Sequence, residues 1–182
     1  MTLDDLQARL IYSMIVAGKA ADFANQVIDR LLAGKPQGVL PFAWLRTLTD
    51  DQLEAALREA RSGNYTKLTR GLRELVDARL DLVRCTPAEL QTVHGIGPKT
   101  ARFWILWTRP GARYAALDVH VLRWLRGKGY DAPTSTPADP KTYDQLERAF
   151  IAEADQRGMT PRELDFAIWQ AGSQTTNQVK VG

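Results

Sequence analysis

The chain is poor in the residues that crosslink proteins or hold metals. Its 182 residues include one cysteine, Cys85, and two histidines. A single cysteine excludes a disulfide within the chain, and it excludes a zinc or iron–sulfur centre built from several of the chain's own thiolates. Two histidines also argue against a histidine-rich metal site. We therefore expect no metal centre.

Long apolar runs are absent as well. The longest, LIYSMIVAG at residues 10–18, is too short to cross a bilayer as a helix. The first residues lack the basic start and the cleavage pattern of a secretory signal peptide. These absences lead us to expect a cytoplasmic protein that makes no contact with a membrane.

Acidic residues are nearly missing from one segment. Residues 93–130 contain seven lysines and arginines and a single acid, Asp118, although the formal net charge of the whole chain is only +3. A basic segment on a nearly neutral body suggests a polyanionic partner, most simply nucleic acid. Arg102 and Arg123 are candidates for that contact. A solvated charged surface without a partner is the alternative.

Alternating patterns of the kind that predict β-strands are also lacking, and apolar residues recur at helical spacing along nearly the whole chain. We expect an all-α protein forming one domain, 1–182, whose polar tail, 173–182, follows the last helix. Capping and helix-breaking residues set the expected ends. The expected helices cover residues 3–18, 23–34, a short stretch around 43, 50–60, 65–84 (as one helix or two), 87–93, 98–108, 118–127, 143–157 and 161–172.

Residues 94–104, HGIGPKTARFW, combine a Gly-Ile-Gly turn with a proline suited to the first position of a helix. With the preceding helix, which Thr86 should cap, they predict a helix–hairpin–helix motif at about 86–109. Gly95 and Gly97 allow positive φ and close approach of a ligand, and Ile96 should insert into the core. Amides at a helix start favour an anion, such as a DNA phosphate. A tight turn without a ligand is the plain alternative.

Lys99 and Asp118 are residues that such a turn does not need. Lys99 falls in the first turn of the second hairpin helix, where the helix dipole disfavours a cation. A neutral lysine amine is a nucleophile that can form a Schiff base. Asp118 opens the next expected helix, where a carboxylate is favoured, so its simplest role is that of a helix cap.

Taken together, GIGPKTA (95–101) and LDVHVLR (117–123) resemble the signature of the helix–hairpin–helix DNA glycosylases, the endonuclease III and 8-oxoguanine DNA glycosylase superfamily. Lys99 and Asp118 stand nineteen residues apart, close to the family spacing of roughly twenty. The resemblance implies two helical lobes flanking a DNA-binding cleft, with Lys99 as the attacking amine and Asp118 as the essential carboxylate. It also implies that His120 supports a DNA phosphate, unless it is an ordinary surface or core histidine.

Two further stretches resemble the same family. VAGKAADFANQVIDRL (16–31) resembles the early helix–loop–helix whose loop fills the gap left by an extruded base, and Lys19 falls at that wedge position. ELDFAIWQAG (163–172) looks like the last helix of the small, mostly prokaryotic 8-oxoguanine glycosylases, with Trp169 and Asp165 as candidates for the base pocket. Phe103, one helical turn from Lys99, is a third candidate. Aromatic residues at helical spacing are otherwise ordinary core residues.

The missing cluster cysteines and the DVH form of the second motif favour the 8-oxoguanine branch. The resemblance therefore implies a bifunctional DNA glycosylase and AP lyase of base excision repair. Such a protein would act as a monomer on damaged double-stranded DNA, without an organic cofactor, with room for a monovalent ion at the hairpin turn. The same chemistry on an oxidised pyrimidine, and a non-catalytic hairpin module that binds DNA, are the alternatives.

Overall fold

The computed structural model describes residues 1–16 and 19–178, with side chains described as far as Gly172, and it divides the chain into two compact units, Met1–Trp104 and Ile105–Gly182. These described residues form helices and no β-strand, which confirms the all-α prediction. The division between the units falls within helix α7. The helices are α1 Leu3–Ile15, α2 Ala21–Ala33, α3 Pro41–Thr47, α4 Asp50–Glu59, α5 Tyr65–Asp77, α6 Pro87–Leu90, α7 Pro98–Thr108, α8 Val119–Gly127, α9 Pro140–Gln156 and α10 Pro161–Gln178.

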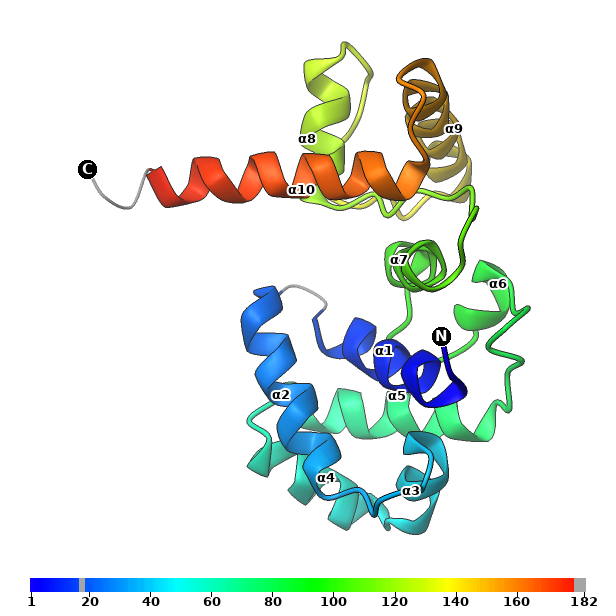
Figure 1. Cartoon of the computed structure of the whole chain (residues 1–182), viewed down its shortest axis with the longest axis vertical. Helices are drawn as coiled ribbons and strands as arrows, with labels where there is room; N and C mark the ends of the chain where they lie inside the picture. Colours follow the sequence, from blue (N-terminus) through cyan, green and yellow to red (C-terminus); the bar gives the residue numbers. More distant parts are fainter. Residues whose placement is uncertain (17–18, 179–182) are drawn as a thin grey trace. The chain divides into compact units, whose positions relative to one another are not determined.

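Helix α5 lies at the centre of the first unit. It packs against α1 on one side and against α3 and α4 on the other, while α2 packs against α1 and α4 (Figure 1). Full burial of one large aliphatic side chain contributes about 1.5–3 kcal/mol, so this core stabilises the unit that carries the hairpin. Its fully buried members include Leu10, Ile11, Ile15, Leu45, Leu53, Leu57, Leu72 and Leu75.

Threonines begin three helices of the first unit in the same way. Thr2, Thr49 and Thr86 each accept a hydrogen bond from the amide three residues on, and the side chain of that residue accepts one back from the threonine amide. Such capping boxes satisfy amides that lack a partner inside the helix, and each cap is worth about 1 kcal/mol. The predicted box at Thr86 is confirmed, so the first helix of the hairpin begins where the sequence indicates.

Some helix ends differ from the expectation. Helix α5 stops at Asp77 because the chain turns at Arg79, whose φ is +48°. Helix α10 continues past Gly172 to Gln178, so the expected end at Gly172 is wrong. No proline follows Gly172 within the helix, and one internal glycine costs only about 1 kcal/mol in a helix already formed. The expected end of the first helix at Gly18 and the last four tail residues, 179–182, lie outside the described residues.

In the second unit, α10 packs against both α8 and α9 (Figure 1). The core between them also takes in residues of the extended segment that precedes α8. It consists of Ala115, Leu117, Val121, Leu122, Leu125, Ala132, Tyr143, Leu146, Phe150, Ala154, Leu164 and Ile168. No helix of the described chain is both long enough and apolar enough to cross a bilayer.

Candidate functional site

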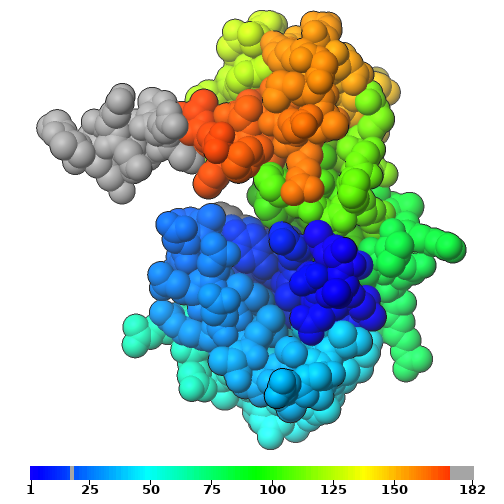
Figure 2. All heavy atoms as spheres, viewed as in Figure 1, coloured from blue at the N-terminus to red at the C-terminus, as the bar shows by residue number. Residues whose placement is uncertain are grey.

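The helix–hairpin–helix consists of α6, the turn at residues 94–97, and α7, as the sequence predicts. Gly95 has φ +88°, which favours glycine there, and Ile96 is 4% exposed, so the predicted insertion of Ile96 into the core is confirmed. A Cβ atom added at Gly97 would meet no atom within 4 Å. The surface over Gly97 is therefore open to a ligand, and α6 lies on the molecular surface in Figure 2.

Lys99 lies in the first turn of α7, as predicted, and is half-buried. Its Nζ lies 5.1 Å from the centre of the Phe103 ring, so the expected sharing of one helix face by Lys99 and Phe103 is confirmed. Such a cation–π contact contributes about 0.5–1 kcal/mol when exposed, and it directs the amine along the helix without a carboxylate partner.

The segment leading to Asp118 is fixed by buried hydrogen bonds from α9. The amide of Ala115 donates to Glu147 Oε1 at 2.7 Å, and the amide of Leu117 donates to the Tyr143 hydroxyl at 3.2 Å. The same hydroxyl donates to the carbonyl of Ala115 at 2.8 Å. Breaking one such bond leaves a buried group unsatisfied at a cost of about 1–3 kcal/mol, so this backbone is held firmly.

Asp118 is the N-cap of α8, which confirms its expected position at a helix start. Its Oδ1 accepts hydrogen bonds from the amides of His120 and Val121, both at 2.9 Å. No described residue donates to Oδ2, and the side chain is partly exposed. One oxygen therefore fixes the carboxylate, while the other is left to act on a ligand.

His120 lies in the first turn of α8, close to α10. A Cβ atom at Gly172 would lie 2.7 Å from His120 Nδ1, so only glycine leaves room for the imidazole there. Nδ1 is buried and has no hydrogen-bond partner among the described residues. The ring is therefore held by packing, and any polar contact with a ligand must use Nε2.

Aromatic side chains gather along α10 in the second unit. Phe166 and Trp169 stack with ring centres 6.3 Å apart, and Trp107 meets Phe166 edge to face at 5.9 Å. Phe166 is 42% exposed and Trp169 44%, so Trp169 is not a core residue. The expected base-pocket residue Asp165 is buried and accepts a hydrogen bond from the Trp107 indole at 3.3 Å, which fixes one end of this group.

The remaining predicted residues are Lys19, Arg102 and Arg123. Lys19 donates a hydrogen bond from Nζ to the carbonyl of Ser62, which joins the α1–α2 loop to the α4–α5 turn, and burial lowers the pKa of its ammonium. Arg102 is half-buried on α7, and Arg123 is exposed on α8. No group of three or more His, Cys, Asp and Glu side chains able to hold a metal occurs in the described chain.

Contacts between α5 and the hairpin turn were not foreseen from the sequence. The carboxylate of Glu74 accepts the His94 amide at 2.7 Å and pairs with Arg70 Nε at 2.9 Å. Arg70, and then the His94 amide, hold the pKa of Glu74 below its ordinary value, so Glu74 stays ionised. Gly71 lets the turn come close, because a Cβ there would lie 2.5 Å from the His94 carbonyl oxygen. A lone glycine inside a helical pattern was the available signal.

Solved structures with a similar arrangement of helices include proteins from two organisms. The 8-oxoguanine DNA glycosylase of Thermotoga maritima matches with a TM-score of 0.74 at 23% identity, over 92% of this chain and 79% of its own. The Methanocaldococcus jannaschii 8-oxoguanine glycosylase/lyase, solved with a 15mer DNA containing 8-oxoguanine, matches with the same score at 17% identity, over 95% of this chain and 83% of its own. No family model matches the chain.

The chain has the fold of the helical 8-oxoguanine DNA glycosylases. The helical glycosylase fold implied by the sequence resemblance is thereby confirmed. Lys99 belongs to the first unit of this glycosylase fold and Asp118 to the second, and each stands at the helix start where the motif placed it.

Proposed function

We propose that this chain is a DNA glycosylase with AP lyase activity that excises 8-oxoguanine from double-stranded DNA. The observation that carries the proposal is that two unusual residues each stand at a helix start within the glycosylase fold. Lys99 follows the hairpin turn on α7, and Asp118 caps α8 through one carboxylate oxygen. A protein that held DNA only through backbone amides would need neither side chain.

In the proposed mechanism, the hairpin turn binds a backbone phosphate and the damaged base leaves the stack. The bond between base and sugar breaks, its electron pair leaves with the base, and positive charge develops on the sugar. The Asp118 carboxylate stabilises that charge through the oxygen that the helix cap leaves free. The neutral Lys99 amine forms a bond to C1′. The bond from C1′ to the ring oxygen O4′ then breaks, one amine proton passes to O4′, and the product is a protonated imine.

The lyase step follows from that imine. It acidifies the proton on C2′, and loss of this proton expels the 3′ phosphate by β-elimination. Every atom in these steps comes from DNA, from Lys99 or from water, so we propose no organic cofactor. We further propose that the protein works as a monomer on chromosomal DNA in the cytoplasm, with a monovalent ion at the hairpin turn where phosphate binds.

The base is assigned from the likeness to 8-oxoguanine glycosylases and from the exposed aromatic rings of α10. An extruded base needs an aromatic face, and Trp169 offers one beside Phe166. Phe103, which lies against the Lys99 amine, is the corresponding candidate on α7. In the first unit, Lys19 is a candidate for filling the gap that the extruded base leaves in the DNA.

Borohydride trapping tests the proposal, because borohydride reduces an imine to a stable covalent adduct. Three duplexes are compared: one with a single 8-oxoguanine, one with an abasic site and one undamaged. We expect an adduct on the first two that is lost in Lys99→Gln. Trapping on the abasic duplex alone would support the lysine chemistry but would indicate that the enzyme excises another base, such as an oxidised pyrimidine. Binding without any trapping would favour a non-catalytic hairpin module.

A further inference from the structure

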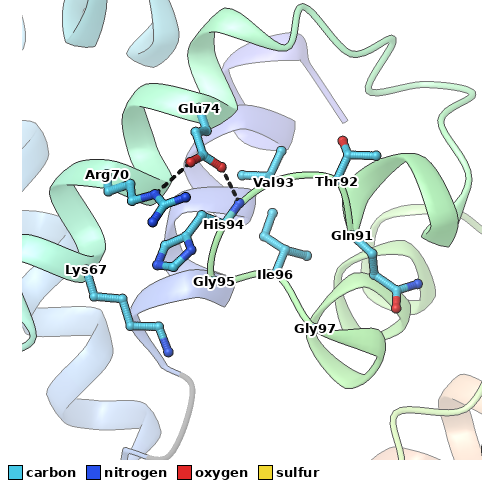
Figure 3. Close-up of a pocket in the computed structure, with 10 residues that line it drawn as sticks. All are labelled: Lys67, Arg70, Glu74, Gln91, Thr92, Val93, His94, Gly95, Ile96 and Gly97. Carbon is cyan, nitrogen blue, oxygen red and sulfur yellow. Dashed lines mark hydrogen bonds and ion pairs between the residues drawn. The ribbon is translucent and has the colours of Figure 1, made fainter. Parts of the chain in front are cut away.

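The hairpin turn borders an open pocket of about 470 Å³, whose other wall is α5. Lys67 and Arg70 come from one face of α5, one helical turn apart, and His94 comes from the turn itself. Figure 3 shows these three side chains together on one side of the turn, with Gln91 and Thr92 on the other. The pocket is therefore lined by nitrogen donors on the side that faces α5.

The charge in this pocket is positive. Glu74 is its only acid, and its two carboxylate oxygens are occupied by Arg70 and by the His94 amide. Arg70 pairs through Nε, which leaves both terminal NH2 groups of its guanidinium for another ligand, and its side chain is 66% exposed. Lys67 is exposed and forms no ion pair among the described residues.

The shape of the pocket also fits an extended anion rather than a small buried one. It is open to solvent and contiguous with Gly95 and Gly97, the residues of the turn. Two cations one helical turn apart, beside a phosphate held at the turn, suit a neighbouring phosphate of the same strand.

We propose that Lys67 and Arg70 of α5 bind the DNA backbone next to the phosphate held by the hairpin turn. This inference rests on the proposed function for the identity of its partner, DNA. It assigns α5 two roles: Gly71 and Glu74 position the turn, and the adjacent cations extend the surface that contacts the strand. The contact reads no bases, so it acts equally on damaged and undamaged DNA.

The test measures the dissociation constant for an undamaged duplex between about 50 and 200 mM salt. Each lost phosphate contact lowers the slope of log Kd against log salt by about one, so we expect Lys67→Ala/Arg70→Ala to lower it by about two. At the low-salt end the double variant should bind about tenfold more weakly. Thermal unfolding confirms that the variant is folded.

Arg58→Ala is the matched control. Arg58 is another exposed arginine of the same unit, and it pairs with Glu54 four residues earlier, as Arg70 pairs with Glu74 four residues later. Its removal should leave the slope unchanged. A double variant with the slope of the Arg58→Ala protein would overturn the proposal.

Excision assays on the same proteins separate this proposal from the previous one. A reduced slope in the double variant, together with no excision by the wild type, would retain the α5 contact and reject the glycosylase. An unchanged slope together with normal excision would reject the α5 contact and retain the glycosylase. A wild-type chain that binds no DNA at any salt concentration would reject both.

Discussion

Replacement of Gly71 by alanine should displace the hairpin turn without removing any residue that touches DNA. Gly71 lies in the middle of α5, where a Cβ atom would stand 2.5 Å from the His94 carbonyl oxygen and 2.8 Å from the Met14 methyl carbon. The methionine end can rotate away. The carbonyl cannot do so easily, because the adjacent amide of His94 is bound to Glu74.

Two opposing contributions to the free energy of unfolding partly cancel. Restoring ordinary van der Waals distance requires the turn to withdraw by roughly 1 Å, and overpacking of this kind costs about 1–3 kcal/mol. Alanine in place of glycine within a helix returns about 1 kcal/mol. The free energy of unfolding should therefore fall by between about zero and 2 kcal/mol, which leaves the protein folded.

The affinity for DNA should fall by more than the free energy of unfolding. A hydrogen bond from the turn to a charged phosphate is worth about 1.5–3 kcal/mol, so moving the turn out of position should weaken binding about tenfold or more. Fluorescence anisotropy with an undamaged duplex measures this, with thermal unfolding of the same sample beside it.

Gly127→Ala serves as the control for this experiment. Gly127 is the last residue of α8, and a Cβ there would meet nothing within 4 Å. This variant should keep the affinity of the wild type, with a free energy of unfolding that is unchanged or higher by up to about 1 kcal/mol. If Gly71→Ala instead binds DNA with wild-type affinity, the idea that α5 fixes the position of the turn is refuted.

Two further predictions concern the turn and the carboxylate. Gly97→Ala should unfold at the wild-type temperature, because its Cβ meets no atom of the chain. It should bind every duplex several-fold more weakly, because the methyl group occupies the space of the phosphate. Equal affinity in anisotropy measurements would place the phosphate elsewhere. Asp118→Asn keeps an oxygen for the helix cap, so the free energy of unfolding should change by less than about 1 kcal/mol. Single-turnover base release should slow by about two orders of magnitude or more. A near-normal rate would reduce Asp118 to a helix cap.

The hairpin could be predicted from the sequence because its determinants are local. A capping threonine, a proline at the first helical position and two glycines around Ile96 all act within about a dozen residues. The structure confirms the cap at Thr86, the positive φ of Gly95 and the burial of Ile96. The same holds for Asp118, whose hydrogen bonds reach only two and three residues along the chain. Short-range hydrogen bonds leave recognisable patterns in a sequence.

The long-range hydrogen bonds that hold the hairpin turn and the segment before Asp118 could not be predicted in this way. Glu74 lies 20 residues from the amide it binds, and Glu147 lies 32 residues from the amide of Ala115. A glutamate on a helix is ordinarily a solvated residue, so nothing in the local pattern marks either one as the acceptor of a distant amide. The extent of α10 was missed for the opposite reason, since a local signal, Gly172, suggested an end that the rest of the helix overrides.

These supports have a physical feature in common: they bind backbone amides, and they leave free the side-chain atoms to which the proposed mechanism assigns the chemistry. Glu74 takes the His94 amide, Tyr143 takes the Leu117 amide, and Asp118 uses a single oxygen to cap α8. A carboxylate or hydroxyl that bound the Lys99 amine directly would hold it in place but would also favour its protonated form. Hydrogen bonds to the backbone hold the segments that carry Lys99 and Asp118 in position, and they do not favour the protonated form of the amine.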